Sequence, residues 1–213
     1  MKRLVVFISG RGSNMQAIVN ACTSGVLNAK VVAVISDQPD AAGLAWASAQ
    51  GLNARCVPRG DYASKTEHQA ALLAAANDTN PDWILLAGFM RILSPAFIAG
   101  AVAPIVNIHP SRLPKYKGLD THQRCLDAGD TVHGASVHIV TAELDDGPVI
   151  AQSCVEVLPQ DDADSLAARV LKTEHPLYIF SIHKLLTDAV EYSDGHLIPG
   201  DLCEPLPLQF SEF

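Results

Sequence analysis

Short apolar runs alternate with segments of helical periodicity through the first half of the chain, and this alternation limits the possible folds more than any other feature. The runs are rich in β-branched residues, which is typical of parallel strands covered on both faces. The expected elements are strand Leu4–Ser9, helix Met15–Ala21, strand Val31–Ser36, helix Leu44–Ala49, helix Lys65–Ala76 and strand Trp83–Ala87. This order predicts a Rossmann-like, doubly wound α/β sheet.

The second half of the chain breaks this rhythm. After a strand at Ile105–Ile108, further strands are expected over His133–Val140 and Val149–Val157, with only a loop between them. Neighbouring strands joined by a loop pair antiparallel, so we expect a mixed but mostly parallel sheet. A long helix is expected over Asp161–Leu186, because its start is rich in Asp and the helix dipole favours acidic residues there.

A chain of 213 residues has the length of one α/β domain. We expect that single domain to occupy residues 1–190. Residues 191–198 have the pattern of a small hairpin, and the proline-rich segment after them is typical of a weakly ordered end. Residues 191–213 are therefore predicted to form a C-terminal hairpin and tail.

Composition and charge exclude several classes of protein. No apolar run reaches the roughly 20 residues that span a bilayer, and the N-terminal apolar run is too short for a signal peptide. The five cysteines are scattered and never spaced as CxxC, which suits a soluble protein of the reducing cytoplasm and indicates no zinc ribbon. No His/Cys pair has metal-ligand spacing, so no metal site is expected. A net charge of −8 disfavours binding to nucleic acid.

The end of the strand at residues 105–108 carries a carboxamide and an imidazole. Residues two apart on a strand point to the same side, so Asn107 and His109 are expected to face one cleft, and Pro110 ends the strand. Asp145, in the loop after a neighbouring strand, would orient the imidazole and favour its protonated form. The alternative is structural: Asn107 and His109 tie down a turn, and Asp145, or Asp146 in its place, forms an Asx turn with Gly147 at positive φ.

A glycine-rich turn, Gly10 to Asn14, lies between the first strand and the first helix. Such a turn allows close approach of the backbone, and the helix N-terminus presents N–H groups to an anion. Met15 replaces the third glycine of a dinucleotide motif and the Walker motif is missing, which favours a phosphomonoester. The alternative is a tight turn with Ser13 as the helix N-cap.

Two other segments are candidates for binding. Residues 88–93 follow a strand, so an apolar ring system is expected to lie along them; the alternative is a buried strand exit with Arg91 in a structural ion pair. Ser94 and Pro95 are expected to begin the next helix. The basic residues Arg112, Lys115 and Lys117 form either an anion-facing loop or a solvated one.

Four segments in this order closely resemble the phosphoribosylglycinamide formyltransferases, the folate-dependent enzymes of purine biosynthesis. They are Ser9-Gly10-Arg11-Gly12-Ser13-Asn14, Gly88-Phe89-Met90-Arg91-Ile92-Leu93, Asn107-Ile108-His109-Pro110-Ser111 and Asp145-Asp146-Gly147-Pro148-Val149-Ile150. The resemblance implies a formyltransferase fold, with residues 1–190 as the catalytic domain. It also implies transfer of the formyl group of 10-formyltetrahydrofolate to the primary amine of glycinamide ribonucleotide.

The resemblance also implies roles for individual residues. The catalytic residues are Asn107, His109 and Asp145. The substrate-binding residues are Gly12, Ser13 and Asn14, at the phosphate, and Glu174. The folate-binding residues are Lys65, Met90, Arg91, Ile92, Leu93 and Asn107. The implied partners are these two small molecules, in a cytoplasmic monomer or homodimer without a metal.

The chain departs from the family pattern at three positions. Arg112 lies where Ser-Leu-Leu-Pro is usual, Asp120 lies where a histidine is common, and Lys65 replaces an arginine. Relatives of the family provide alternatives. Methionyl-tRNA formyltransferase carries a further C-terminal domain, and formyltetrahydrofolate hydrolase carries an N-terminal regulatory domain. A non-catalytic folate-binding module is the alternative of a different class.

Overall fold

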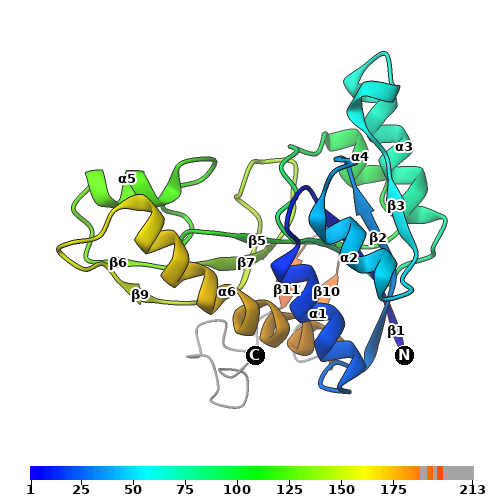
Figure 1. Cartoon of the computed structure of the whole chain (residues 1–213). Coiled ribbons are helices and arrows are strands. Elements are labelled where there is room, and N and C mark those ends of the chain that lie inside the picture. The colour runs from blue at the N-terminus through cyan, green and yellow to red at the C-terminus, as the bar shows by residue number, and fades with distance from the viewer. Residues whose placement is uncertain (188–190, 194–195, 199–213) are drawn as a thin grey trace. The chain divides into compact units, whose positions relative to one another are not determined.

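The computed structural model describes residues 1–187, 191–193 and 196–198 (Figure 1). The chain divides into two compact units, residues 1–107 and residues 108–213. The predicted domain over residues 1–190 stays a prediction. Strands β10 (Glu191–Ser193) and β11 (His196–Ile198) pair antiparallel, as the predicted hairpin requires. The predicted tail after residue 198 lies outside the described residues.

The first unit is built on parallel strands. These are β1 (Lys2–Ile8), β2 (Ala29–Ser36), β3 (Ala54–Cys56), β4 (Trp83–Leu86) and β5 (Ile105–His109), whose last two residues belong to the second unit. They follow the order β3-β2-β1-β4-β5, and each neighbouring pair is parallel. Every side chain from Leu4 to Ile8 is fully buried, so both faces of β1 are covered, which explains its continuous apolar run.

Helices connect these strands. They are α1 (Ser13–Thr23), α2 (Ala42–Ala49), α3 (Lys65–Asn77), α4 (Pro95–Gly100) and the short 3₁₀ helix η1 (Arg59–Asp61). Helix α1 packs against β2 and α2, and α3 packs against β2 and α4 (Figure 1). Ser64 and Ser94 cap α3 and α4 by accepting hydrogen bonds from Glu67 N and Phe97 N. The predicted start of α4 at Ser94 and Pro95 is confirmed.

The second unit contains the remaining elements. They are α5 (Thr121–Asp127), β6 (Val132–His133), β7 (Ser136–Ile139), β8 (Val149–Gln152), β9 (Val155–Glu156) and α6 (Ala163–Leu186). Helix α6 packs against α5, β7 and β8 (Figure 1). Asp162 caps α6 in a capping box with Ser165, so the acidic residues predicted at the helix start lie at its cap.

The two long strands predicted over His133–Val140 and Val149–Val157 are each divided into two. Strands β7 and β8 pair antiparallel, and β6 and β9 form a separate antiparallel pair. At the break, the Ser153 hydroxyl accepts a hydrogen bond from Ala135 N at 3.0 Å, while Ser153 N donates to the Ala135 carbonyl at 2.9 Å. A side chain thus replaces one backbone hydrogen bond, which interrupts the ladder between the two pairs.

The strands of the main sheet follow the order β3-β2-β1-β4-β5-β7-β8. The strands from β3 to β5 are parallel, and β7 and β8 are antiparallel. This arrangement confirms the predicted α/β fold with a mixed, mostly parallel sheet. Parallel strands run in the same direction. The predicted binding segments therefore follow the C-terminal ends of β1, β4 and β5.

Candidate active site

A histidine and an aspartate meet in the second unit. His109 is the last residue of β5 and is 5% exposed, while Asp145 lies in the connection between β7 and β8. His109 Nδ1 lies 3.4 Å from Asp145 Oδ2, and the carboxylate side chain is 10% exposed. Gly118 N donates a hydrogen bond to the same carboxylate oxygen at 2.9 Å, which fixes its position. The predicted contact between these two side chains is therefore present.

The other ring nitrogen of His109 is also held. Nε2 lies 2.9 Å from the carbonyl oxygen of Tyr116. A carbonyl only accepts hydrogen bonds, so Nε2 carries a hydrogen, and Nδ1 faces a carboxylate. Both ring nitrogens thus point at oxygen acceptors. This geometry suits a positively charged imidazolium.

A second imidazole, which the sequence analysis did not assign to this site, lies on the other side of Asp145. His138 Nε2 is 3.7 Å from Asp145 Oδ1, and Nδ1 donates to the Ile139 carbonyl at 2.9 Å. Burial lowers the pKa of His138, against smaller opposing effects of the Ile139 carbonyl and Asp145. The signal in the sequence is that His138 lies on β7, the strand that leads into the Asp145 loop.

The conformation of Asp145 differs from the alternative turn. Asp145 itself has φ +49°, whereas Gly147 is not among the described glycines of positive φ. The predicted Asx turn with Gly147 at positive φ is therefore wrong in its detail. A Cβ at residue 147 would collide with the Ile139 carbonyl oxygen, so glycine is required for close packing and not for its left-handed conformation.

Asn107 precedes His109 by two residues on β5, where it pairs in register with Leu86 of β4. Strand alternation directs the two side chains to the same side. Asn107 is partly exposed, whereas its neighbours Val106 and Ile108 are buried. Its side chain is therefore accessible at the strand end where His109 lies.

The glycine-rich turn of the first unit joins β1 to α1. Gly12 has φ +71° and is itself the N-cap of α1, without a side-chain cap. The alternative with Ser13 as N-cap is therefore wrong, since Ser13 is the first residue inside the helix. The first turn of α1 holds no acidic residue, so its positive end is not neutralised by its own side chains.

Helix α2 packs directly on this turn. Gly43 N donates to the Gly10 carbonyl at 3.0 Å. A Cβ on Gly43 would lie 3.0 Å from the Arg11 carbonyl oxygen and 2.8 Å from Ile8 Cδ1. Only glycine at this position lets α2 approach so closely, and this contact fixes the backbone of the turn.

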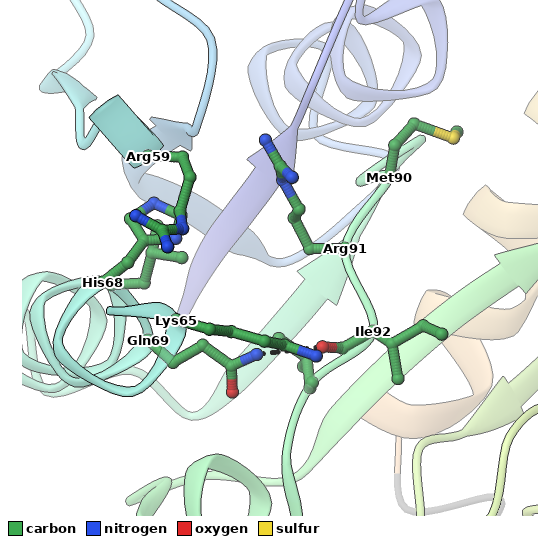
Figure 2. Close-up of a pocket in the computed structure, with 9 residues that line it drawn as sticks. Arg59, Lys65, His68, Gln69, Met90, Arg91 and Ile92 are labelled. Carbon is green, nitrogen blue, oxygen red and sulfur yellow. Dashed lines mark hydrogen bonds between the residues drawn. The ribbon is translucent and has the colours of Figure 1, made fainter. Parts of the chain in front are cut away.

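A pocket of about 440 Å³ lies in the first unit (Figure 2). It is lined by Arg59, Lys65, His68, Gln69, Leu72, Met90, Arg91, Ile92 and Leu93. All the predicted folate contacts except Asn107 line it. Arg59 and the α3 residues His68, Gln69 and Leu72 were not predicted from the sequence. The signal for the latter is helical spacing, since they lie three, four and seven residues after Lys65, on one face of α3.

The two walls of this pocket are joined by a glutamine. Figure 2 shows Lys65 and Gln69 of α3 opposite the segment that carries Arg91 and Ile92. Gln69 Nε2 donates to the Ile92 carbonyl at 2.9 Å, and its Oε1 accepts from Ser94 N at 2.8 Å. These bonds hold the segment after β4 in place against α3.

Arg91 is anchored on its other side. Its Nε lies 2.6 Å from Asp37 Oδ2, and the Ser9 hydroxyl donates to Asp37 Oδ1 at 2.6 Å. Burial of Asp37 favours the neutral acid, but the hydrogen bonds from Ser9, Arg91 and Gln38 outweigh it and lower the pKa of Asp37. The structural ion pair considered for Arg91 is therefore present, and Arg91 lines the pocket as well.

The last predicted residue, Glu174, is half-buried on α6 in the second unit.

Among the described residues, no helix is long and apolar enough to cross a membrane. Within the same part of the chain, no group of three or more His, Cys, Asp or Glu side chains is placed to hold a metal ion.

Comparisons with known proteins agree on one family. The profile of the Formyl transferase family matches residues 2–182. The chain is 46% identical over 175 residues to the phosphoribosylglycinamide formyltransferase of Escherichia coli K12, which covers 82% of both proteins. It is similar in structure to glycinamide ribonucleotide transformylase 1 from Symbiobacterium toebii, with a TM-score of 0.88, 36% identity and 92% and 93% of the two chains covered. The enzyme from Brucella melitensis has a TM-score of 0.82 and 48% identity, with 92% and 99% covered.

Proposed function

The chain belongs to the formyl transferase family, among the phosphoribosylglycinamide formyltransferases, and we propose that it formylates the primary amine of glycinamide ribonucleotide. The formyl donor is 10-formyltetrahydrofolate, and the products are N-formylglycinamide ribonucleotide and tetrahydrofolate. This is a one-carbon transfer in the purine pathway that leads to IMP. The observation that carries the proposal is the buried 3.4 Å contact between His109 and Asp145. His109 lies on β5, two residues after Asn107.

Three side chains perform the transfer. The amine attacks the formyl carbon, the Asn107 amide donates a hydrogen bond to the developing oxyanion, and the positive charge of the His109 imidazolium stabilises it. The bond between the formyl carbon and N10 of the folate then breaks, the amine loses one proton, and N10 receives one. Asp145 holds the His109 ring and its charge in place and takes part in this proton transfer.

The phosphorylated substrate binds to the turn before α1. Gly12, Ser13 and Asn14 hold its phosphate, because the turn presents backbone N–H groups at the positive end of an 11-residue helix. Glu174 binds a part of the substrate other than its phosphate. Its carboxylate is an acceptor suited to hydroxyl or ammonium groups.

The folate binds in the pocket of the first unit. Met90, Ile92 and Leu93 supply apolar surface for its ring system, Lys65 and Arg59 supply positive charge for its acidic end, and Arg91 lines the pocket while paired with Asp37. Asn107 contacts the formyl group. The volume of about 440 Å³ and this mixture of apolar and cationic lining fit a flat, partly anionic ligand.

The partners follow from this chemistry. The enzyme works in the cytoplasm as a monomer or homodimer, on two small molecules, without nucleic acid and without a metal. Its net charge of −8 supports the absence of nucleic acid binding, since contacts to a phosphate backbone need clustered positive charge.

One assay tests the proposal against its alternatives. Purified protein is mixed with 10-formyltetrahydrofolate, and tetrahydrofolate release is followed with and without glycinamide ribonucleotide. We expect release only when the amine is present, together with formylated ribonucleotide in equal amount. Release without the amine would identify a formyltetrahydrofolate hydrolase, and binding without turnover would identify a non-catalytic folate-binding module.

A further inference from the structure

The second unit contains another cavity, of about 370 Å³, that the proposed reaction does not use. Its walls come from the loop after β5, the connection between α5 and β6, and strand β8. The polar and charged groups that line it are Arg112, Lys115, Tyr116, Asp130, Thr131, His133 and Gln152.

Arg112 is a half-buried cation without a partner in the described part of the chain. Its guanidinium makes no hydrogen bond or ion pair with any described residue, and Nε is sealed from solvent. Buried donors in native proteins are nearly always paired, because an unpaired one loses its hydration without compensation. An arginine held in this way at a cavity wall indicates that a ligand supplies the missing acceptor.

The packing around Arg112 supports its stem. A Cβ at residue 134 would lie 3.2 Å from Arg112 Cγ and would collide with the Ser153 carbonyl oxygen. Gly134 is therefore required where the stem of Arg112 passes. The arginine thus has a defined place in the wall and is not a solvated surface side chain.

The charges around the cavity leave Arg112 uncompensated. Lys115 Nζ lies 2.7 Å from Asp130 Oδ2, so these two charges offset each other. The Tyr116 hydroxyl donates to the same carboxylate, which raises the pKa of Tyr116 to about 12 and keeps the phenol neutral. Burial lowers the pKa of His133 to about 4, so its ring is also neutral near pH 7. The cavity therefore carries one net positive charge.

We propose that this cavity binds a phosphoryl group, either of inorganic phosphate or of a small phosphate ester. The planar fork of Arg112 donates two parallel hydrogen bonds to one side of such a group. Lys115 keeps hydrogens that are not used on Asp130, and Thr131 adds a hydroxyl from the α5–β6 connection. A phosphoryl group has three oxygens to accept these donors, whereas a carboxylate has two.

Nuclear magnetic resonance tests this directly. The full chain is labelled with ¹⁵N, and the Arg112 Nε–H signal is assigned by its loss in Arg112→Lys. Inorganic phosphate should shift this signal and the backbone amides of residues 112, 113, 115, 116 and 130–133, with saturation in the millimolar range. Sodium chloride at matched ionic strength is the control. No shift with phosphate, or an equal and unsaturable shift with chloride, would overturn the proposal.

Three further titrations identify the ligand and test whether Arg112 binds it. Ribose 5-phosphate that binds more tightly than inorganic phosphate identifies an ester ligand, and the reverse identifies free phosphate. Acetate that shifts the same signals at equal concentration would contradict the phosphoryl assignment. Arg112→Leu should weaken phosphate binding at the amides of residues 130–133 by about tenfold or more, while Arg55→Leu, an arginine of the first unit, should not change it.

Discussion

At the scale of single residues, the site depends on the directed polar groups around His109. Replacing Asn107 or His109 by alanine should lower turnover by at least ~10²–10³-fold, because each change removes one group that stabilises the oxyanion. Steady-state formyl transfer measures this loss, and circular dichroism checks the fold. Asn20→Ala, a change at an exposed asparagine of α1, is the matched control and should keep full activity. Near-normal turnover in folded His109→Ala would refute the assignment.

Lys65 provides a test on the folate side. Its ammonium faces the pocket as a point charge, so charge and not fork geometry should matter. We expect Lys65→Arg to bind formyl folate about as well as the native chain and Lys65→Ala to bind it several-fold less tightly. Fluorescence titration gives the affinities, and Lys30→Ala, on exposed β2 surface, serves as the comparison. Equal affinity of Lys65→Ala and the native chain would remove Lys65 from the site.

At the scale of secondary-structure elements, the contact between α2 and the glycine-rich turn fixes the predicted phosphate site. In Gly43→Ala, the added methyl group would meet the Arg11 carbonyl and Ile8, so α2 or the turn must shift. We expect the KM for glycinamide ribonucleotide to rise about tenfold or more, as for loss of a hydrogen bond to a charged group, while the KM for formyl folate changes little. Kinetics with each substrate varied in turn separates the two effects.

Gly60→Ala is the control for this element. A Cβ at residue 60 would meet no atom within 4 Å, and Gly60 belongs to η1 and to neither the turn nor α2. Both KM values should stay unchanged in this variant. If Gly43→Ala behaved like Gly60→Ala, the turn would not depend on α2 and the argument from close packing would fail.

At the scale of the whole molecule, buried and half-buried histidines should make stability depend on pH. The pKa values of His122, His133, His138 and His175 are all lowered, chiefly by burial. Below their ordinary value of about 6.5, these rings bind protons in the unfolded chain but not in the folded one. The free energy of unfolding should therefore fall as the pH falls from about 6.5 towards about 4, the pKa of His133.

Urea unfolding at a series of pH values measures this effect. His133 faces His122, with 3.1 Å between Nε2 and Nδ1, and its pKa also responds to Asp130 and His109. His133→Gln should make the loss of stability between pH 6.5 and 4 shallower, because glutamine binds no proton in the unfolded chain, where His133 binds one. An identical slope in the variant would show that His133 does not contribute.

The sequence by itself determined the fold class and the chemistry-bearing segments. Apolar runs without polar interruptions appear only where both faces of a strand are buried, so Leu4 to Ile8 predicted a covered parallel sheet. Asn107 and His109 were linked by the two-residue period of a strand, which is a local property of the backbone. The pocket residues that follow β4 were also predicted from the local sequence, because the end of a strand can be recognised there.

Only the tertiary structure decided which distant groups meet. His138 became a neighbour of Asp145, Gln69 joined α3 to residue 92, and Arg112 was left without a partner among the described residues. The divided strands at residues 132–139 and 149–156 depend on the contact between Ala135 and Ser153. Such contacts join residues far apart in the chain, so no local period encodes them, and they are fixed only when the folded chain brings these atoms within hydrogen-bond distance.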